Sequence, residues 1–202
     1  TYEPDLAMSY NNLGVLYYNS QRFKESEEVY LSALEIRQRL SQKKPETYEP
    51  DLAMSYNNLG VLYYNSQRFK EAEEVYLSAL EIRQRLSQKN PETYEPNLAG
   101  SYNNLGNLYY QTQRFKEAEE ARLAALEIYI CLSKISPETY EPKCANILSD
   151  FGFFYCNTSP TGSFDPEKAR KCFEQALALY GKYETCVEKY ERVSKILKKY
   201  FT

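Results

Sequence analysis

SYNNLGVLYY and its near-copy SYNNLGNLYY stand at three places in the chain: Ser9–Tyr18, Ser55–Tyr64 and Ser101–Tyr110. The flanking tetrapeptide TYEP begins at Thr1, Thr47, Thr93 and Thr139, so the repeat period is 46 residues. The first two copies differ only at Ser26/Ala72 and at Lys44/Asn90. A fixed period of this length indicates an array of one supersecondary unit, in which neighbouring units bury each other's apolar faces.

Each unit is predicted to be a pair of helices. In the second copy the first helix has Pro50 in its first turn, a position that tolerates proline. Its apolar face repeats at spacings of three and four residues, with Leu52, Tyr56, Leu59, Gly60 and Tyr63. A turn at 65–67 leads to a second helix from about Arg68, whose buried side is predicted to contain Phe69, Ala72, Tyr76, Ala79, Leu80 and Leu86.

The outer side of this second helix is charged, and it places Glu81 four residues before Arg85, a spacing that favours an ion pair. Asn90-Pro91 is predicted to end the helix, which makes KNPETYEP a loop between units. The expected fold is therefore an all-α solenoid of helix-turn-helix units with no strands. We expect one array over residues 1–202, with units 1–46, 47–92, 93–138 and 139–184 and a capping helix at about 185–201.

The capping helix is predicted from a stripe of apolar side chains: Val187, Tyr190, Val193, Leu197 and Tyr200. Lys198 and Lys199 suit the C-terminal end of a helix, where the helix dipole is negative. An alternative is that this basic amphipathic segment lies on a membrane surface. The capping role is favoured, because the last unit of an array needs a cover with a polar outer face.

Composition excludes several classes of function. The 202 residues have a net charge of −3, which gives no electrostatic signature of nucleic-acid binding. The absence of His, together with five Cys without a CxxC pair, argues against a metal site, a cofactor and an enzyme. Unpaired cysteines fit a reduced intracellular setting, and we expect a cytoplasmic protein. No apolar run approaches the ~20 residues that span a bilayer.

The spacing of Tyr56, Leu59-Gly60, Tyr63, Ala72, Tyr76 and Ala79 resembles the tetratricopeptide repeat (TPR). The fourth unit fits the same pattern if the turn between its helices is lengthened by SPTGSFD. The long unit, its paired Asn and its ALEIR segment are most similar to the repeats of kinesin light chains. The resemblance implies a right-handed superhelix whose first helices line a concave groove.

The first helices are unusual because residues 52–66 contain no charged side chain. Asn is a poor helix former, so Asn57 and Asn58 need a reason to stand in mid-helix. One interpretation is a ladder of Asn side chains that hydrogen-bond between neighbouring units, and Asn58 fits this role better because it adjoins the packing face. The other is a ligand surface, because the resemblance implies that the residues two before, two after and five after the Leu face the groove.

The candidate groove residues in the four units are Asn11, Val15, Tyr18, Asn19, Asn57, Val61, Tyr64, Asn65, Asn103, Asn107, Tyr110, Gln111, Asn146, Ser149 and Phe153. Amide and phenol groups suit the backbone of an extended peptide. The family's carboxylate clamp needs Lys and Arg at such positions, and there are none here. We therefore expect a non-enzymatic module that binds an extended, not strongly acidic segment of a protein partner.

A structural or regulatory solenoid, such as a sensor arm acting by spacing and self-association, is the alternative function. The first unit lacks a cap, so stacking of copies end to end, or another homo-oligomer, is a further expectation. At the end of the third unit, RQR of the earlier copies becomes Tyr129-Ile130-Cys131, and Ile135 follows. We expect these side chains to pack against the lengthened turn or the capping helix rather than stay exposed.

Overall fold

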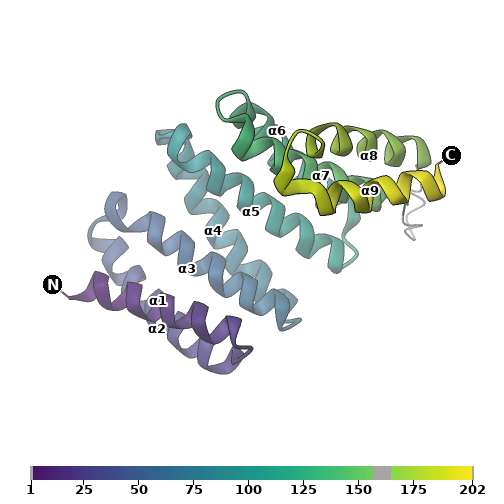
Figure 1. Cartoon of the computed structure of the whole chain (residues 1–202). Helices are drawn as coiled ribbons and strands as arrows, with labels where there is room; N and C mark the ends of the chain where they lie inside the picture. Colours follow the sequence, from purple (N-terminus) through teal and green to yellow (C-terminus); the bar gives the residue numbers. More distant parts are fainter. Residues whose placement is uncertain (1, 157–164, 202) are drawn as a thin grey trace. The chain divides into compact units, whose positions relative to one another are not determined.

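The computed structural model describes residues 2–156 and 165–201, and within them it contains helices and no strands (Figure 1). This confirms the all-α prediction. The chain divides into two compact units, Thr1–Arg114 and Phe115–Thr202. Most of the predicted lengthened turn, from Ser159 to Phe164, lies outside the described residues.

The first compact unit contains five helices, each packed against the next along the chain: α1 (Glu3–Asn19), α2 (Phe23–Lys43), α3 (Pro45–Asn65), α4 (Phe69–Lys89) and α5 (Pro91–Gln111). The predicted apolar stripes form its core. Leu59, Ala72 and Ala79 are completely buried, and Tyr76 is 3% exposed. Burying a side chain such as that of Leu59 contributes about 1.5–3 kcal/mol.

A close contact between the two helices of a unit explains the Gly in the first two copies of NNLG. A Cβ atom on Gly60 would lie 2.4 Å from two ring carbons of Tyr76, and Gly14 faces Tyr30 in the same way. Any larger residue at Gly60 would therefore displace a buried aromatic ring, which close-packed interiors resist. The hairpin needs Gly here so that the ring can lie on the backbone of the first helix.

The first helices start earlier than the sequence predicted. α3 begins at Pro45 and contains Pro50, and α5 begins at Pro91. The segment KNPETYEP was predicted to be a loop between units, but its last six residues, from Pro91 onward, belong to α5. The cause is that the first proline of PETYEP takes the first helical position, where its missing N–H costs nothing. Pro50 then removes only one further backbone hydrogen bond near the helix start.

Buried arginines connect one helix pair to the next. Arg37 is 3% exposed, and its Nη1 donates to Ser55 Oγ at 2.7 Å and to the carbonyl oxygen of Asp51 at 3.1 Å. Arg83 makes the same bonds one repeat later, to Ser101 Oγ and the carbonyl oxygen of Asn97. Desolvation lowers the pKa of Arg37, so the hydrogen bonds must offset a burial cost.

Arg39 and Arg85 each pair with a carboxylate on another helix rather than along their own helix. Arg85 Nη2 lies 2.8 Å from Glu49 Oε1, and no described ion pair joins Arg85 to Glu81. The predicted Glu81–Arg85 pair is therefore wrong. Arg39 repeats the observed contact with Glu3 at 2.6 Å. Arg85 pairs with Glu49 rather than with Glu81 because the packing of α3 against α4 holds Glu49 beside Arg85.

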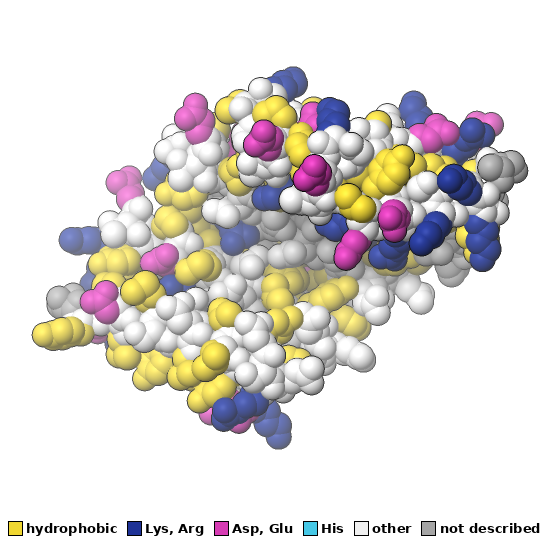
Figure 2. Space-filling model, in the orientation of Figure 1, with side chains coloured by type: hydrophobic (Ala, Val, Ile, Leu, Met, Phe, Trp, Pro, Cys, Tyr) yellow, Lys and Arg dark blue, Asp and Glu magenta, His cyan; other side chains and the backbone are white. Residues whose placement is uncertain are grey.

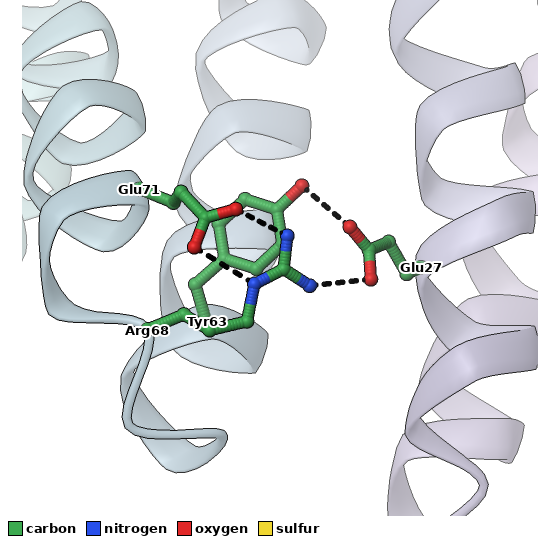
Figure 3. A network of polar contacts seen from close by, with 4 residues as sticks. All are labelled: Glu27, Tyr63, Arg68 and Glu71. Carbon is green, nitrogen blue, oxygen red and sulfur yellow. Dashed lines mark hydrogen bonds and ion pairs between the residues drawn. The ribbon is translucent and has the colours of Figure 1, made fainter.

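A second set of charges joins α2 to the turn after α3 (Figure 3). Glu27 accepts a hydrogen bond from the Tyr63 hydroxyl at 3.1 Å and one from Arg68 Nη1 at 2.6 Å. Arg68 also binds Glu71 through Nε at 2.8 Å, and its guanidinium lies 4.2 Å from the centroid of the Tyr63 ring. Burial and the Glu27 carboxylate raise the pKa of Tyr63 to about 12, so the phenol stays a donor.

The second compact unit contains α6 (Phe115–Ser133), α7 (Pro137–Cys156), α8 (Pro166–Tyr180), the short 3-10 helix η1 (Glu184–Cys186) and α9 (Val187–Tyr200). Its core groups Phe173, Ala176, Tyr180, Cys186 and Val193. Phe173 lies against Gly152 in the same way as Tyr76 lies against Gly60. Successive helices pack on each other from α6 to α9.

α9 packs against α8, but with a narrower stripe than the sequence predicted. Val193 is 2% exposed, and Ile196, Leu197 and Phe201 pack around it. Val187, Tyr190 and Tyr200 are 53%, 41% and 66% exposed, so their predicted burial is wrong. A short helix touches its neighbour along only two or three turns, which leaves the side chains at its ends in solvent.

The substituted end of the third repeat is only partly packed. Tyr129 is buried and stacks on Tyr140 at 6.1 Å, with Lys143 Nζ 5.3 Å from its ring centroid. Ile130 is 45% exposed, and Ile135 is 76% exposed. The expectation that all of these side chains are covered is therefore wrong for Ile130 and Ile135, whereas Tyr129 is covered by α7.

Candidate functional site

The candidate surface of the first unit is built from α1, α3 and α5. Figure 2 shows mainly uncharged and hydrophobic side chains over much of α1 and α3, and Lys and Arg side chains gathered over α9. Among the predicted groove residues of this unit, Asn11 is buried. Those that are exposed are Val15, Asn19, Asn65 and Gln111. Those that are half-buried are Tyr18, Asn57, Val61, Tyr64, Asn103, Asn107 and Tyr110.

The Asn ladder is present. Asn58 Nδ2 donates to Asn11 Oδ1 at 2.9 Å, and Asn104 Nδ2 donates to Asn57 Oδ1 at 3.0 Å. Each of these bonds joins one first helix to the next, which confirms the interpretation that these side chains bond between units. The side-chain oxygen of Asn57 accepts a hydrogen bond within the ladder. If Asn57 binds a ligand, its amide nitrogen is therefore the group that donates to it.

Four of the predicted groove residues meet at a small pocket of about 170 Å³ in the first unit. It is lined by Val61, Tyr64, Asn65, Tyr76, Asn104 and Asn107. Asn65 Nδ2 donates to the Tyr18 hydroxyl at 2.9 Å and to the carbonyl oxygen of Val61 at 2.8 Å, which fixes its orientation. Sequence reasoning assigned Tyr76 to the core only, whereas its ring also forms part of the pocket wall.

The chemistry of this pocket is that of a recognition surface. Its walls offer amides, phenols and a methyl-rich side chain, with no carboxylate or ammonium group. Burial raises the pKa of Tyr76, so its hydroxyl is neutral at physiological pH. Such groups can pair with peptide N–H and C=O groups, because amides donate and accept together.

The second unit has its own pocket, of about 310 Å³, between α7, α8 and α9. Its lining residues are Asn146, Ser149, Asp150, Phe153, Tyr180, Lys189, Arg192 and Val193. Three predicted groove residues are therefore together here: Asn146, Ser149 and Phe153. Lys189 and Arg192 are the residues that the sequence analysis missed, because it looked for basic side chains only on the first helices.

The polar groups of this pocket are connected. Asn146 Oδ1 accepts hydrogen bonds from the Tyr180 hydroxyl and from Lys189 Nζ, both at 2.9 Å. Arg192 lies 5.2 Å from the centroid of the Phe153 ring. Burial raises the pKa of Asp150, against the opposing effect of Arg122, Arg192 and Lys189. Burial, with a smaller effect of Asp150, raises the pKa of Tyr180 to about 12.

The described residues contain no group of three or more His, Cys, Asp or Glu side chains arranged to hold a metal ion. Across residues 2–156 and 165–201, no helix is both long enough and apolar enough to cross a membrane. All five cysteines are free thiols, and burial raises the pKa of Cys144 to about 11, which makes it a poor nucleophile.

Comparison with solved structures supports the fold. BtubC (BKLC) from P. vanneervenii is 23% identical over 99% of this chain and 84% of its own, with a TM-score of 0.59. PilF of Pseudomonas aeruginosa is 20% identical over 99% of this chain and 72% of its own, with a TM-score of 0.61. A search of curated proteins finds no match to this chain.

A family model described as tetratricopeptide repeat matches two overlapping spans, residues 5–85 and 51–130. These spans contain the repeated helix pairs, with the Gly that faces Tyr in each of the first two. The match covers more than half of the chain, and the solved structures agree with it. The chain belongs to the tetratricopeptide repeat family.

Proposed function

We propose that this chain is a non-enzymatic interaction module that binds an extended, not strongly acidic segment of a protein partner along its Asn- and Tyr-rich first helices. Tetratricopeptide repeats in general mediate protein–protein interaction. The observation that carries the finer proposal is the uncharged pocket beside Val61, Tyr64, Asn65 and Asn107. An exposed helix face without a binding role would be expected to contain Lys and Glu.

The ladder makes this surface suitable for binding. Because Asn58 and Asn104 hold neighbouring helices in register, the side chains next to them are already ordered before a ligand arrives. A preorganised surface loses less conformational entropy on binding. Each peptide hydrogen bond formed there contributes about 0.5–1.5 kcal/mol net. Several such bonds along an extended segment give useful affinity without charge.

The test uses short peptides selected from a random display library on the immobilised protein. Val61→Lys places a charge in the uncharged pocket, where peptide burial would strip its water, and we expect affinity to fall about tenfold or more. Isothermal titration calorimetry measures the change. Leu77→Lys is the matched control, since Leu77 is 43% exposed on α4 and does not line the pocket. Unchanged binding by a folded Val61→Lys variant would contradict the proposal.

A separate observation favours self-association as a second candidate function. Leu16 is 60% exposed, whereas its equivalents Leu62 and Leu108 are each 1% exposed beneath the preceding helix pair. Leu6 is 44% exposed, compared with 8% for Leu52. The α1 face from Leu6 to Asn19 has no charged residue, so two copies of it can approach each other without repulsion.

We infer that a second copy of the chain covers this face, in a symmetric pair formed by α1 with α1. End-to-end stacking is disfavoured, because Val193 of α9 already occupies the outer face of the last helix pair. Sedimentation equilibrium should show a dimer that Leu6→Glu with Leu16→Glu dissociates. The control pair, Leu31→Glu with Leu77→Glu, removes exposed leucines of α2 and α4 and should leave the dimer intact. A wild-type chain that stays monomeric at high concentration would exclude this candidate.

A further inference from the structure

The second unit has a further groove, on the opposite side of α7 from Asn146 and Phe153. Its volume is about 420 Å³, and α6, α7 and α8 all contribute to its walls. Burial raises the pKa of the Cys144 thiol in this wall to about 11, so the thiol is uncharged. Most of the lining side chains are apolar: Leu126, Ile130, Cys144, Leu148, Ala178 and Leu179. This space is the α6–α8 groove.

The earlier repeats show how the groove arises from changes in sequence. Ile130 and Leu148 take the places of Gln84 and Tyr102, one period of 46 residues earlier. Gln84 Nε2 donates to the Tyr102 hydroxyl at 2.8 Å, and the preceding copy has the same bond at 2.9 Å. A hydrogen-bonded polar pair in the first unit is therefore replaced by two aliphatic side chains in the second.

Two more substitutions enlarge the same space. Cys144 takes the place of Leu52 and Leu98. Ala178 takes the place of Glu81, allowing for the five residues added between α7 and α8. Each change makes the side chain smaller, and the second also removes a charge. Exposed helix positions usually hold residues such as Lys and Glu, so the combined changes indicate an apolar surface with a purpose other than solubility.

The size of the groove fits a small molecule better than a protein. Its lining on α6 runs from Leu126 to Ser133, which is about 10 Å at the helical rise of about 1.5 Å per residue. A stable protein interface covers about 800 Å² of each partner, far more than an opening of this length provides. Small-molecule sites are commonly clefts of about 300–1,000 Å³ with mainly apolar walls. The volume of about 420 Å³ lies in that range.

The polar groups at one end of the groove disfavour a charged ligand. Glu141 accepts hydrogen bonds from Lys182 Nζ and from the Tyr183 hydroxyl, both at 2.8 Å, so its charge is already balanced. Ser133 Oγ donates to the carbonyl oxygen of Ile130 at 2.9 Å. An anionic group placed here would be repelled by Glu141, and a cationic group would have to compete with Lys182. The walls therefore suit an uncharged ligand.

We propose that the α6–α8 groove binds an uncharged aliphatic molecule about 10 Å long, such as a linear alcohol. Its hydrocarbon chain lies between Ile130 and Leu148, and its polar end lies at the opening in water. The site is independent of the peptide surface on the first helices. Each methylene that leaves water adds hydrophobic free energy, so affinity should rise about fourfold per methylene until the groove is full.

The test is a titration of the full chain, labelled with ¹³C at its Ile and Leu methyl groups, followed by ¹H–¹³C NMR. The probes are 1-butanol, 1-hexanol and 1-octanol, with octanoate as the charged control. We expect saturable shifts of the Ile130 and Leu179 methyl signals, tighter binding of 1-octanol than of 1-hexanol by about tenfold or more, and weaker binding of octanoate. Equal affinities of the three alcohols, or shifts that do not saturate with 1-octanol, would overturn the proposal.

Residues from the chain's own repeats supply the variant that should close the groove. Ile130→Gln with Leu148→Tyr restores the hydrogen-bonded pair of the first unit. It should weaken 1-octanol binding about tenfold or more, as read from the Leu179 methyl signals. Leu77→Tyr with Leu123→Gln introduces the same two side chains at leucines that are 43% exposed outside the groove, and should have little effect. Equal losses in both double variants would show non-specific binding to exposed leucines and would overturn the site.

A single substitution keeps the test decisive if the double variant does not fold. Cys144→Leu narrows the groove with the residue that the earlier copies have at this position, and it leaves the walls apolar. Circular dichroism should show an unchanged helix content. The affinity for 1-octanol should fall several-fold, because the added side chain occupies part of the space for the hydrocarbon chain. Unchanged affinity in a folded Cys144→Leu variant would contradict binding inside the groove.

Discussion

At the scale of single residues, the turn inside each of the first three helix pairs has the same unfavourable backbone conformation. Gln21, Gln67 and Gln113 have φ angles of 59°, 59° and 61°, in the left-handed region. Gln67 N–H donates to the carbonyl oxygen of Tyr64, and Arg68 N–H donates to that of Tyr63. This is the Schellman ending of a helix, in which glycine is the preferred residue.

Gln67→Gly should therefore stabilise the protein by about 0.5–1 kcal/mol, because the left-handed cost of about 1–2 kcal/mol exceeds the added chain entropy of about 0.5–1 kcal/mol. Urea denaturation followed by circular dichroism measures the free energy of unfolding. Glu74→Gly, at an exposed position inside α4, is the control and should destabilise by about 1 kcal/mol. A loss of stability in Gln67→Gly would contradict this account of the turn.

At the scale of elements, hydrophobic spacing predicted the helix pairs well, because buried faces such as that of Leu59, Ala72 and Tyr76 repeat with the period of a helix. It did not predict where the first helices begin. Pro45 could equally end one helix or start the next, and in the structure it takes the first helical position of α3. α9 was predicted as a cap, but which of its side chains touch α8 depends on its position across that helix.

The candidate site was predictable to the same extent. Asn65 and Asn107 were found because the resemblance to tetratricopeptide repeats implies that positions after the repeated Leu-Gly step face a groove, and the structure puts both residues at one pocket. Lys189 and Arg192 were missed because a different element brings them to Asn146 through space. Their separation of three residues, next to the buried Val193, is the signal that could have found them.

At the scale of the whole molecule, repeats with identical sequence make identical contacts. Where the sequence of a repeat differs, the corresponding contact can still be recognised. The Arg85–Glu49 ion pair joins residues 36 apart, and the Lys182–Glu141 pair joins residues 41 apart. Lys182 therefore takes the place of Arg85 after five added residues between α7 and α8. The fourth helix pair keeps the fold of the others while its inner surface exchanges Asn and Val for Ser149, Asp150 and Phe153.

The central claim is that the uncharged first helices form a binding surface, and that the Asn58–Asn11 bond of the ladder holds neighbouring repeats together. Side-chain amide signals in a ¹H–¹⁵N NMR spectrum test it most directly, since both kinds of Asn are visible in one experiment. On addition of a library-selected peptide, the Asn65 and Asn107 amide signals should shift, while that of Asn58, bonded to Asn11, should stay in place. Shifts confined to residues outside the pocket, with Asn65 and Asn107 unmoved at saturating peptide, would contradict the account.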